Sequence, residues 1–218
     1  DNVFSAVIEN NDLEVRTYGD IIAYGMQVSD SMYSAIMYEG YDGDETSPNN
    51  IEIKGNKVNI YSEYMIYGIT VISAGIQVDE DGEMELCAFP LNITIADNVV
   101  YADSDKGVIG IAGKVYNMTV INNNVTAIGT SAEGVVSYDE IGVGTYALGV
   151  VYNGGNAEDD YYVVVRDNIV STDVTPEYLS SETYSEYVTF ENNTVYKMVD
   201  GTYVIDDDNY DLYFDENG

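Results

Sequence analysis

An eight-residue unit that recurs five times constrains the fold of this chain more than any other feature. The copies are Ile51–Val58, Ile93–Val100, Met118–Val125, Val163–Val170 and Val188–Val195. Each copy has an asparagine at its sixth position, with apolar residues five and three positions before it and two positions after it. Because side chains alternate between the two faces of a strand, this spacing predicts a strand with one buried face, a bend at the asparagine, and a second strand.

The asparagines of these copies are expected to stack on one another at one bend. They are Asn56, Asn98, Asn123, Asn168 and Asn193, and Asn2 is interpreted as part of a sixth copy. A side-chain amide both donates and accepts hydrogen bonds, and asparagine tolerates the left-handed backbone that a two-residue bend needs. We therefore predict a ladder of structural asparagines, with the residues three positions earlier buried beneath it.

The spacing of the asparagines predicts the number of coils. From Asn2 to Asn193 the intervals are 54, 42, 25, 45 and 25 residues, so we take 25 residues as one coil and the longer intervals as two coils, one of them without asparagine. A second signature supplies a third strand, in Ala23–Met26, Ile66–Ile69, Val108–Ile111 and Ala147–Val150.

The predicted fold is all-β, a single-stranded right-handed parallel β-helix of about eight or nine coils. The handedness rests on the general preference for right-handed crossovers between parallel strands. Residues 1–200 are expected to form the repeat domain, and residues 201–218 a final coil or an acidic C-terminal segment.

The charge of the chain excludes several partners. Thirty-nine acidic and seven basic residues give a formal net charge of −32, which disfavours nucleic acid and anionic membranes. Hydrophobic residues make up 45% of the chain, too many for a disordered acidic tail, yet no apolar run is long enough for membrane insertion. The single cysteine, Cys87, lies in an apolar run and is interpreted as a core residue.

The repeated Val-Thr-Ile-x-x-Asn-x-Val unit, alternating with Tyr-Gly-Ile-like strands in an acidic chain rich in Asn and Tyr, resembles the β-helix repeat regions of adhesin-like surface proteins of methanogenic archaea. The resemblance covers residues 1 to about 200. It implies a secreted, extracellular cell-surface glycoprotein that mediates attachment, and it provides no catalytic residues to carry over.

Catalysis is not expected. β-Helix lyases and hydrolases act on polysaccharides through a calcium-assisted basic residue or through clustered aspartates. Here the chain has no histidine, and its arginines are Arg16 and Arg166. Paired acids such as Asp159 and Asp160 are more simply interpreted as solvated loop residues in so acidic a chain.

Acidic turns raise the question of a metal. Asp79, Asp81 and Glu83 alternate around Gly82, an oxygen-rich arrangement that calcium favours, although the pattern of an EF-hand is not complete. Similar segments begin at Asp42 and at Asp206. A solvated turn is the simpler interpretation, and weak calcium binding at residues 79, 81 and 83 is the alternative hypothesis. No other cofactor is expected.

Two further features concern the surface. Glycosylation sequons occur at Asn92, Asn117, Asn124 and Asn192; the first two share one position of adjacent copies, where stacked amides would also explain them. Among the 22 tyrosines, the candidates for an exposed patch are Tyr64, Tyr67, Tyr138, Tyr146 and Tyr152, against the alternative that stacked tyrosines stabilise the sheet.

Three function classes follow. The first is a non-enzymatic adhesin-like module that attaches to a glycan or a protein of another cell or of the cell wall, with end-to-end self-association as a further form of contact. The second is a structural spacer or envelope component. The third, least favoured, is a polysaccharide lyase or hydrolase. A glycan-binding patch would favour the first class, and a groove with convergent carboxylates the third.

Overall fold

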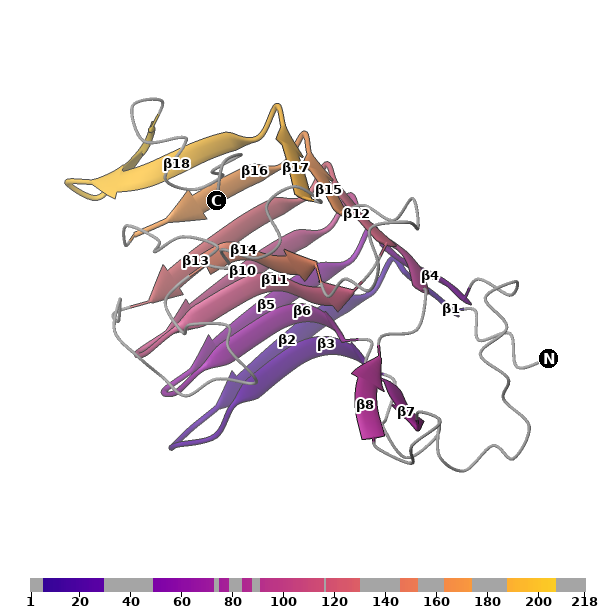
Figure 1. Ribbon diagram of the computed structural model, residues 1–218. Coiled ribbons are helices and arrows are strands. Elements are labelled where there is room, and N and C mark those ends of the chain that lie inside the picture. The colour runs from indigo at the N-terminus through magenta and orange to yellow at the C-terminus, as the bar shows by residue number, and fades with distance from the viewer. Residues whose placement is uncertain are drawn as a thin grey trace.

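The computed structural model describes residues 6–29, 49–72, 75–78, 84–87, 91–115, 117–129, 146–152, 163–173 and 188–206. Every regular element in these residues is a β-strand. Most of the strands belong to three parallel sheets, in which strands far apart in the sequence lie side by side (Figure 1). The prediction of an all-β fold with stacked parallel strands is confirmed.

Successive strands of the chain enter the three sheets in turn. Sheet A contains, in spatial order, β1 (Ala6–Glu9), β4 (Asn49–Lys54), β9 (Leu91–Ala96), β12 (Asn117–Ile121), β15 (Val163–Arg166) and β17 (Val188–Glu191). Sheet B contains β2 (Asp12–Thr17), β5 (Lys57–Ser62), β10 (Val99–Ser104), β13 (Asn124–Gly129), β16 (Ile169–Thr172) and β18 (Thr194–Val199). Sheet C contains β3 (Ala23–Ser29), β6 (Ile66–Ile72), β11 (Val108–Val115) and β14 (Tyr146–Tyr152). We call each set of consecutive strands a rung: it begins with a strand of sheet A, continues with one of sheet B and, in the first four rungs, ends with one of sheet C.

The core lies between the sheets and follows the predicted alternation. In β5, exposed Lys57 and Asn59 alternate with Val58 and Ile60, which are 0% and 2% exposed. The residues expected beneath the asparagines are all buried: Ile53, Ile95, Val120, Val165 and Phe190. Period-two alternation in the sequence therefore identified the buried face of sheets A and B.

The bend between sheets A and B, which we call the asparagine corner, is held by side-chain amides. The Oδ1 of Asn98 accepts hydrogen bonds from the main-chain N–H and the Nδ2 of Asn56, at 2.9 and 3.0 Å. The Nδ2 of Asn98 in turn donates to Oδ1 of Asn123 and to the carbonyl oxygen of Ile53, both at 2.9 Å. The same pattern continues through Asn168 to Asn193.

The left-handed residue of the bend differs from the one we expected. It is the residue before each ladder asparagine that has a positive φ: Asn10, Gly55, Asp97, Asn122, Asp167 and Asn192, with φ between 52° and 64°. The ladder asparagines themselves are directed into the corner and are at most 6% exposed from Asn56 to Asn193. Glycine, asparagine and aspartate at the preceding position are the residues that tolerate this conformation best.

The prediction of eight or nine coils is wrong. Asn56 and Asn98, 42 residues apart, are bonded directly, as are Asn123 and Asn168, 45 residues apart. The long intervals are therefore single rungs with inserted residues, and the described part of the chain contains six rungs. The next asparagine below Asn56 is Asn11, whose N–H and Nδ2 donate to Asn56 Oδ1 at 3.0 and 2.9 Å. Asn2, which we assigned to this position, lies outside the described residues.

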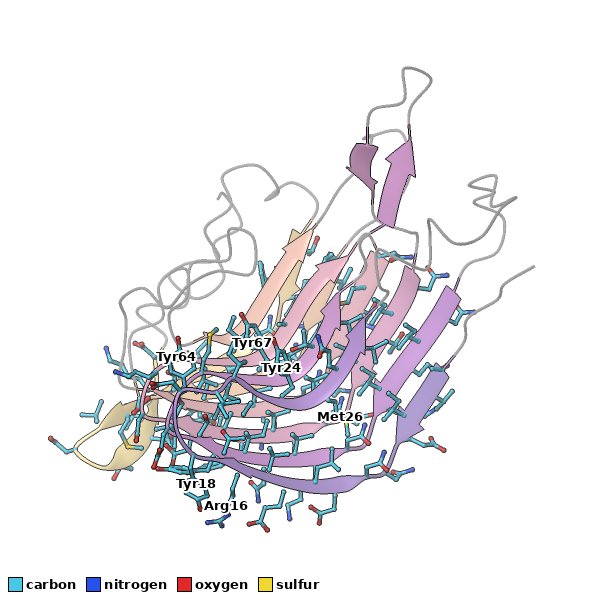
Figure 2. The ribbon with its side chains drawn as sticks, turned by 90° about the horizontal axis from the view of Figure 1, so that it is seen from below. Arg16, Tyr18, Tyr24, Met26, Tyr64 and Tyr67 are labelled. Atoms are coloured by element: carbon cyan, nitrogen blue, oxygen red, sulfur yellow. The ribbon has the colours of Figure 1, made fainter. Side chains whose placement is uncertain are left out.

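In the sequence, the insertions follow strands of sheet B or sheet C. One of them contains β7 (Gly75–Val78) and β8 (Met84–Cys87), which pair as an antiparallel hairpin that stands away from the three sheets (Figures 1 and 2). Cys87, expected in the core, ends β8, and its side chain lies outside the described part of the structure.

The sixth rung ends in a hairpin rather than in a parallel coil. Strand β19 (Thr202–Ile205) pairs antiparallel with β18, through a turn at Asp200 and Gly201 with φ of 48° and 79°. Positive φ at both central residues is typical of a type I′ turn, for which Asp-Gly is a favoured sequence. Residues 202–205 are therefore the second strand of this hairpin, and residues 207–218 of the expected final coil or acidic segment lie outside the described residues.

The bend between sheets B and C, which we call the serine corner, is built differently. Ser62 Oγ accepts hydrogen bonds from Thr17 Oγ1 at 2.8 Å and from the N–H of Tyr64 at 3.0 Å. Ser104 accepts one from the N–H of Lys106 at 2.9 Å and donates to the carbonyl oxygen of Tyr64.

Beyond the serine corner, the glycine of the second signature is explained by close packing. A Cβ on Gly68 would lie 2.2 Å from the carbonyl oxygen of Gly110 and 2.8 Å from Val100 Cγ1. Gly25 is equally confined, against Gly68 and Val58. A larger side chain at this position would therefore collide both with the next strand of sheet C and with the side chains of sheet B.

Candidate functional site

The residues proposed for calcium lie outside the described part of the structure. Asp79, Asp81 and Glu83 fall between β7 and β8 in the sequence, and the acidic segment at Asp42 is likewise not described. Within the described residues, no group of three or more His, Cys, Asp or Glu side chains is arranged to hold a metal ion. The calcium hypothesis stays a prediction.

The four sequon asparagines fall into two pairs. Asn92 donates from Nδ2 to Asn50 Oδ1 at 3.3 Å, and Asn117 donates from Nδ2 to Asn92 Oδ1 at 2.6 Å. These three form a second, shorter amide row near the N-terminal ends of strands β4, β9 and β12 of sheet A. Asn124, at the start of β13, and Asn192, in the left-handed bend position, are exposed. A glycan on Asn92 or Asn117 would disrupt the amide row, whereas one on Asn124 or Asn192 would not.

The tyrosines expected to form an exposed patch are not exposed where they can be assessed. Tyr67 is 5% exposed and stacks on Tyr24, with ring centroids 5.2 Å apart and ring planes within 9°. Tyr64 is half-buried beside them, in a small cluster centred on Met65 and Ile109. Tyr138 and the side chains of Tyr146 and Tyr152 are not described. Tyr64 and Tyr67 therefore support the alternative, in which stacked tyrosines stabilise the sheet.

A different set of tyrosines reaches the surface, on the outward face of sheet B. We call it the tyrosine–carboxylate surface; it consists of Tyr18, Tyr61 and Tyr101 with Glu63, Asp103, Asp105 and Asp173. Tyr203 of β19 lies next to it, with its hydroxyl group buried. Tyr61 and Asp103 lie side by side on β5 and β10. Tyr18 is 64% exposed and Tyr101 41% exposed. Figure 2 shows Tyr18 on the outer side of the stack, near Arg16, whereas Met26 lies among the side chains inside.

Two of these tyrosines form an open aromatic pair. The ring centroids of Tyr18 and Tyr61 are 6.3 Å apart, and their planes are inclined by 57°. Tyr18 follows β2 and Tyr61 lies in β5, so the pair joins the first two rungs. Because Tyr18 is largely exposed, its ring is accessible to a partner, and the contact with the tilted ring of Tyr61 helps to keep it in place.

The carboxylates of this surface repel one another and alter the nearby tyrosines. Burial, and next the charge of Asp173, raises the pKa of Asp103 above its usual value. Burial and then the charge of Asp103 raise the pKa of Tyr101, and burial and then Asp173 raise the pKa of Tyr203. The pKa of Tyr61 is raised first by Asp105. The phenols therefore stay protonated at neutral pH, as hydrogen-bond donors next to carboxylate acceptors.

The surface can thus offer three kinds of contact to a partner. It has ring faces for stacking, phenol donors and carboxylate acceptors, in neighbouring strands of sheet B and in the residues directly after them. Hydroxyl donors from a partner would relieve the repulsion between Asp103 and Asp173, because hydrogen bonds to a carboxylate stabilise its charged form. The sequence signal for this surface is the alternation in sheet B, which directs residues 61, 101 and 103 outward.

Comparison with known proteins finds no match to a family model, to a curated protein or to a solved structure. The described residues contain no helix of the length and hydrophobicity needed to span a bilayer.

Proposed function

We propose that this chain is a non-enzymatic attachment module of an extracellular cell-surface protein, whose tyrosine–carboxylate surface binds a neutral glycan of another cell or of the cell wall. The single observation that carries the proposal is the exposure of Tyr18 and Tyr101 beside carboxylates on one sheet face. Aromatic rings stack on the apolar faces of sugars, and carboxylates accept hydrogen bonds from sugar hydroxyls. The formal charge of −32 disfavours an acidic glycan.

The proposed architecture is a right-handed parallel β-helix. The three parallel sheets and the asparagine corner support it, because each rung supplies one strand to each of sheets A and B, and the first four rungs supply one to sheet C. The right hand follows from the general rule for parallel crossovers. The sequence resemblance to adhesin-like surface proteins of methanogenic archaea supports the extracellular assignment.

A glycan array with the full chain tests the binding proposal. We expect the wild-type chain to bind neutral oligosaccharides, and a Tyr18→Ala, Tyr101→Ala double variant to lose at least about tenfold in affinity, since each ring contributes on the order of 1 kcal/mol. Val7→Ala is the matched control, because Val7 is 58% exposed on the outward face of sheet A. Unchanged binding by the double variant would contradict the proposed surface.

The second candidate is a structural spacer, and the continuous asparagine corner favours it. Six rungs joined by one hydrogen-bonded row form a stiff element whether or not its surface binds anything. Failure of the wild-type chain to bind any glycan, protein or cell surface would favour the spacer over the attachment module.

A further inference from the structure

The two ends of the stack differ in how well they are covered. In the first rung, Ile8, Leu13 and Val15 are only partly buried, although they pack against the core. Their counterparts in the second rung, Ile53, Val58 and Ile60, are at most 2% exposed. In the sixth rung, Phe190 and Val195 are 5% and 2% exposed, and β19 covers β18. The first-rung end therefore presents partly exposed core residues, whereas at the sixth-rung end the core residues are buried and β19 covers the edge of β18.

The hydrogen bonds between the asparagines of the asparagine corner all run in one direction, from the asparagine of one rung to Oδ1 of the asparagine in the next rung. At the first rung, Oδ1 of Asn11 is therefore the acceptor at the end of the row. Every ladder asparagine from Asn56 to Asn193 accepts on Oδ1 two hydrogen bonds from the asparagine of the rung below. Asn11 donates upward in this way, but it is exposed and its Oδ1 accepts no hydrogen bond from the described residues. An asparagine in the equivalent position of a further rung beneath Asn11 would donate to this Oδ1 from its N–H and its Nδ2, as Asn11 does to Asn56.

The lower edge of β2 offers donors to the same partner. The N–H of Lys57 donates downward to the carbonyl oxygen of Asn11, and Asp12 has the same position in β2 as Lys57 in β5. The N–H of Asp12 is therefore directed away from the stack, and alternation along the strand directs the N–H groups of Glu14 and Arg16 the same way. In the described residues, β2 has a neighbouring strand on one side only.

The first-rung end is also where acidic charge is neutralised. Glu9 faces Lys54 at 3.6 Å, Asp12 faces Lys57 at 3.6 Å, and Glu14 bonds to Arg16 at 2.9 Å. In a chain with a formal charge of −32, each of these three acids next to the open edge has a cationic partner. Strand edges that avoid pairing usually carry unbalanced charge, so this end is electrostatically suited to contact.

We propose that the first-rung end binds a β-strand segment of another chain that carries the same rung sequence. The segment adds in parallel beneath β1 and β2, and its asparagine donates to Asn11 Oδ1. The occupant is a free segment rather than the sixth-rung end of a second copy, because β19 already pairs with β18 at the edge where β2 of a second copy would have to add. The proposal goes beyond glycan binding and does not depend on it.

A fluorescent peptide with the sequence of Leu91–Ser104 tests the proposal against the full chain, because this segment contains Asn98 with a complete strand on each side. We expect saturable binding, at least about tenfold weaker for the same peptide with Asn98→Ala, which has no Nδ2 donor. Hydrogen exchange of the bound chain should show new protection at the amides of Asp12, Glu14 and Arg16. No binding, equal binding of both peptides, or protection confined to other strands would overturn the proposal.

Two variants of the chain locate the site. Glu14→Pro removes an N–H that points away from the stack, so the edge strand should keep its fold while peptide affinity falls at least about tenfold. If Glu14→Pro does not fold, Val15→Lys replaces it: this variant places a charge among the partly buried core residues of the same end and should lower peptide affinity by a similar factor. Circular dichroism verifies the fold of each. Sedimentation showing that the wild-type chain dimerises through this end, with the peptide unable to compete, would assign the end to a second copy and overturn the proposal.

Discussion

The asparagine corner and the serine corner perform the same task, turning the chain between sheets, with different chemistry. At the asparagine corner, one residue type bonds to its own counterpart in the rungs above and below, without interruption from Asn11 to Asn193. At the serine corner, Ser62 and Ser104 bond mainly to main-chain groups near the bend, and the fourth rung has Gly129 in register. The first corner links all six rungs through one repeated residue type, whereas the second links the first three rungs, through hydroxyl groups that also bond to main-chain groups of the bends.

This difference accounts for where the chain varies in length. The ladder keeps one geometry while the interval between its asparagines changes from 25 to 45 residues. In the sequence, the additional residues follow strands of sheet B or sheet C, and none falls between a strand of sheet A and the strand of sheet B that follows it across the asparagine corner. Because the entropy cost of closing a loop rises slowly with its length, such insertions disturb stacking little as long as the ladder is intact.

Breaking the asparagine corner in its middle should have the largest effect on stability. Asn98→Ala removes four side-chain hydrogen bonds at a residue that is 0% exposed. It leaves the N–H of Asn56 without an acceptor and the Nδ2 of Asn56 with only the carbonyl oxygen of Ile8. We expect the free energy of unfolding to fall by about 3–5 kcal/mol, since each buried polar group left unpaired costs about 1–3 kcal/mol. Urea denaturation measures the loss. A loss below about 1 kcal/mol would show that the corner does not join the rungs.

Adding a side chain at Gly68, which packs against the next strand of sheet C and against sheet B, should have the next largest effect. In Gly68→Ala, the new methyl group would meet the carbonyl oxygen of Gly110 at 2.2 Å, which the backbone cannot easily avoid. We expect a loss of about 2–3 kcal/mol in urea denaturation, in the range for overpacked cores. Gly19→Ala is the control for backbone strain: its φ is +84°, nothing lies within 4 Å of the added Cβ, and the loss should be about 1 kcal/mol.

Sequence alone identified the asparagine corner because its signal is local and repeated. It missed Asn11, although Ala6, Ile8 and Leu13 stand at the expected apolar positions around it. The long intervals between asparagines were wrongly predicted to contain additional coils, because the length of an interval does not reveal whether its residues add a strand to the stack. The burial of Tyr67 was not predictable either: alternation directs this side chain to the outer face of sheet C, but packing on that face depends on contacts distant in the sequence.

The serine corner should be weaker than the asparagine corner, and Ser62→Ala measures by how much. The substitution leaves the N–H of Tyr64 and the hydroxyl of Thr17 without their acceptor, at a residue that is 0% exposed. Thr17 is only half-buried, so water can replace its bond. We expect a loss of about 1–2 kcal/mol in the free energy of unfolding. A loss equal to that of Asn98→Ala would remove the distinction between the two corners.

The smallest expected effect is a pH dependence of the free energy of unfolding, which arises at Asp103 beside the serine corner and not at the asparagine corner. Asp103 precedes Ser104, and burial and then Asp173 raise its folded-state pKa, so the folded chain holds this proton more tightly than the unfolded chain does. The ionised carboxylate therefore destabilises the fold at pH values above its raised pKa, and this penalty disappears as pH falls to the ordinary aspartate value of about 3.9. Asp103→Asn should raise the free energy of unfolding at neutral pH by a few tenths of a kcal/mol, because water screens a half-buried charge.

The gain from Asp103→Asn should shrink toward zero between neutral pH and about pH 3.5, which urea denaturation across that range measures. The loss caused by Asn98→Ala should stay constant over the same range, because amides do not titrate. A gain from Asp103→Asn that grows toward acid pH would mean that Asp103 is stabilised in its charged form, so that attraction rather than repulsion acts on it in the tyrosine–carboxylate surface.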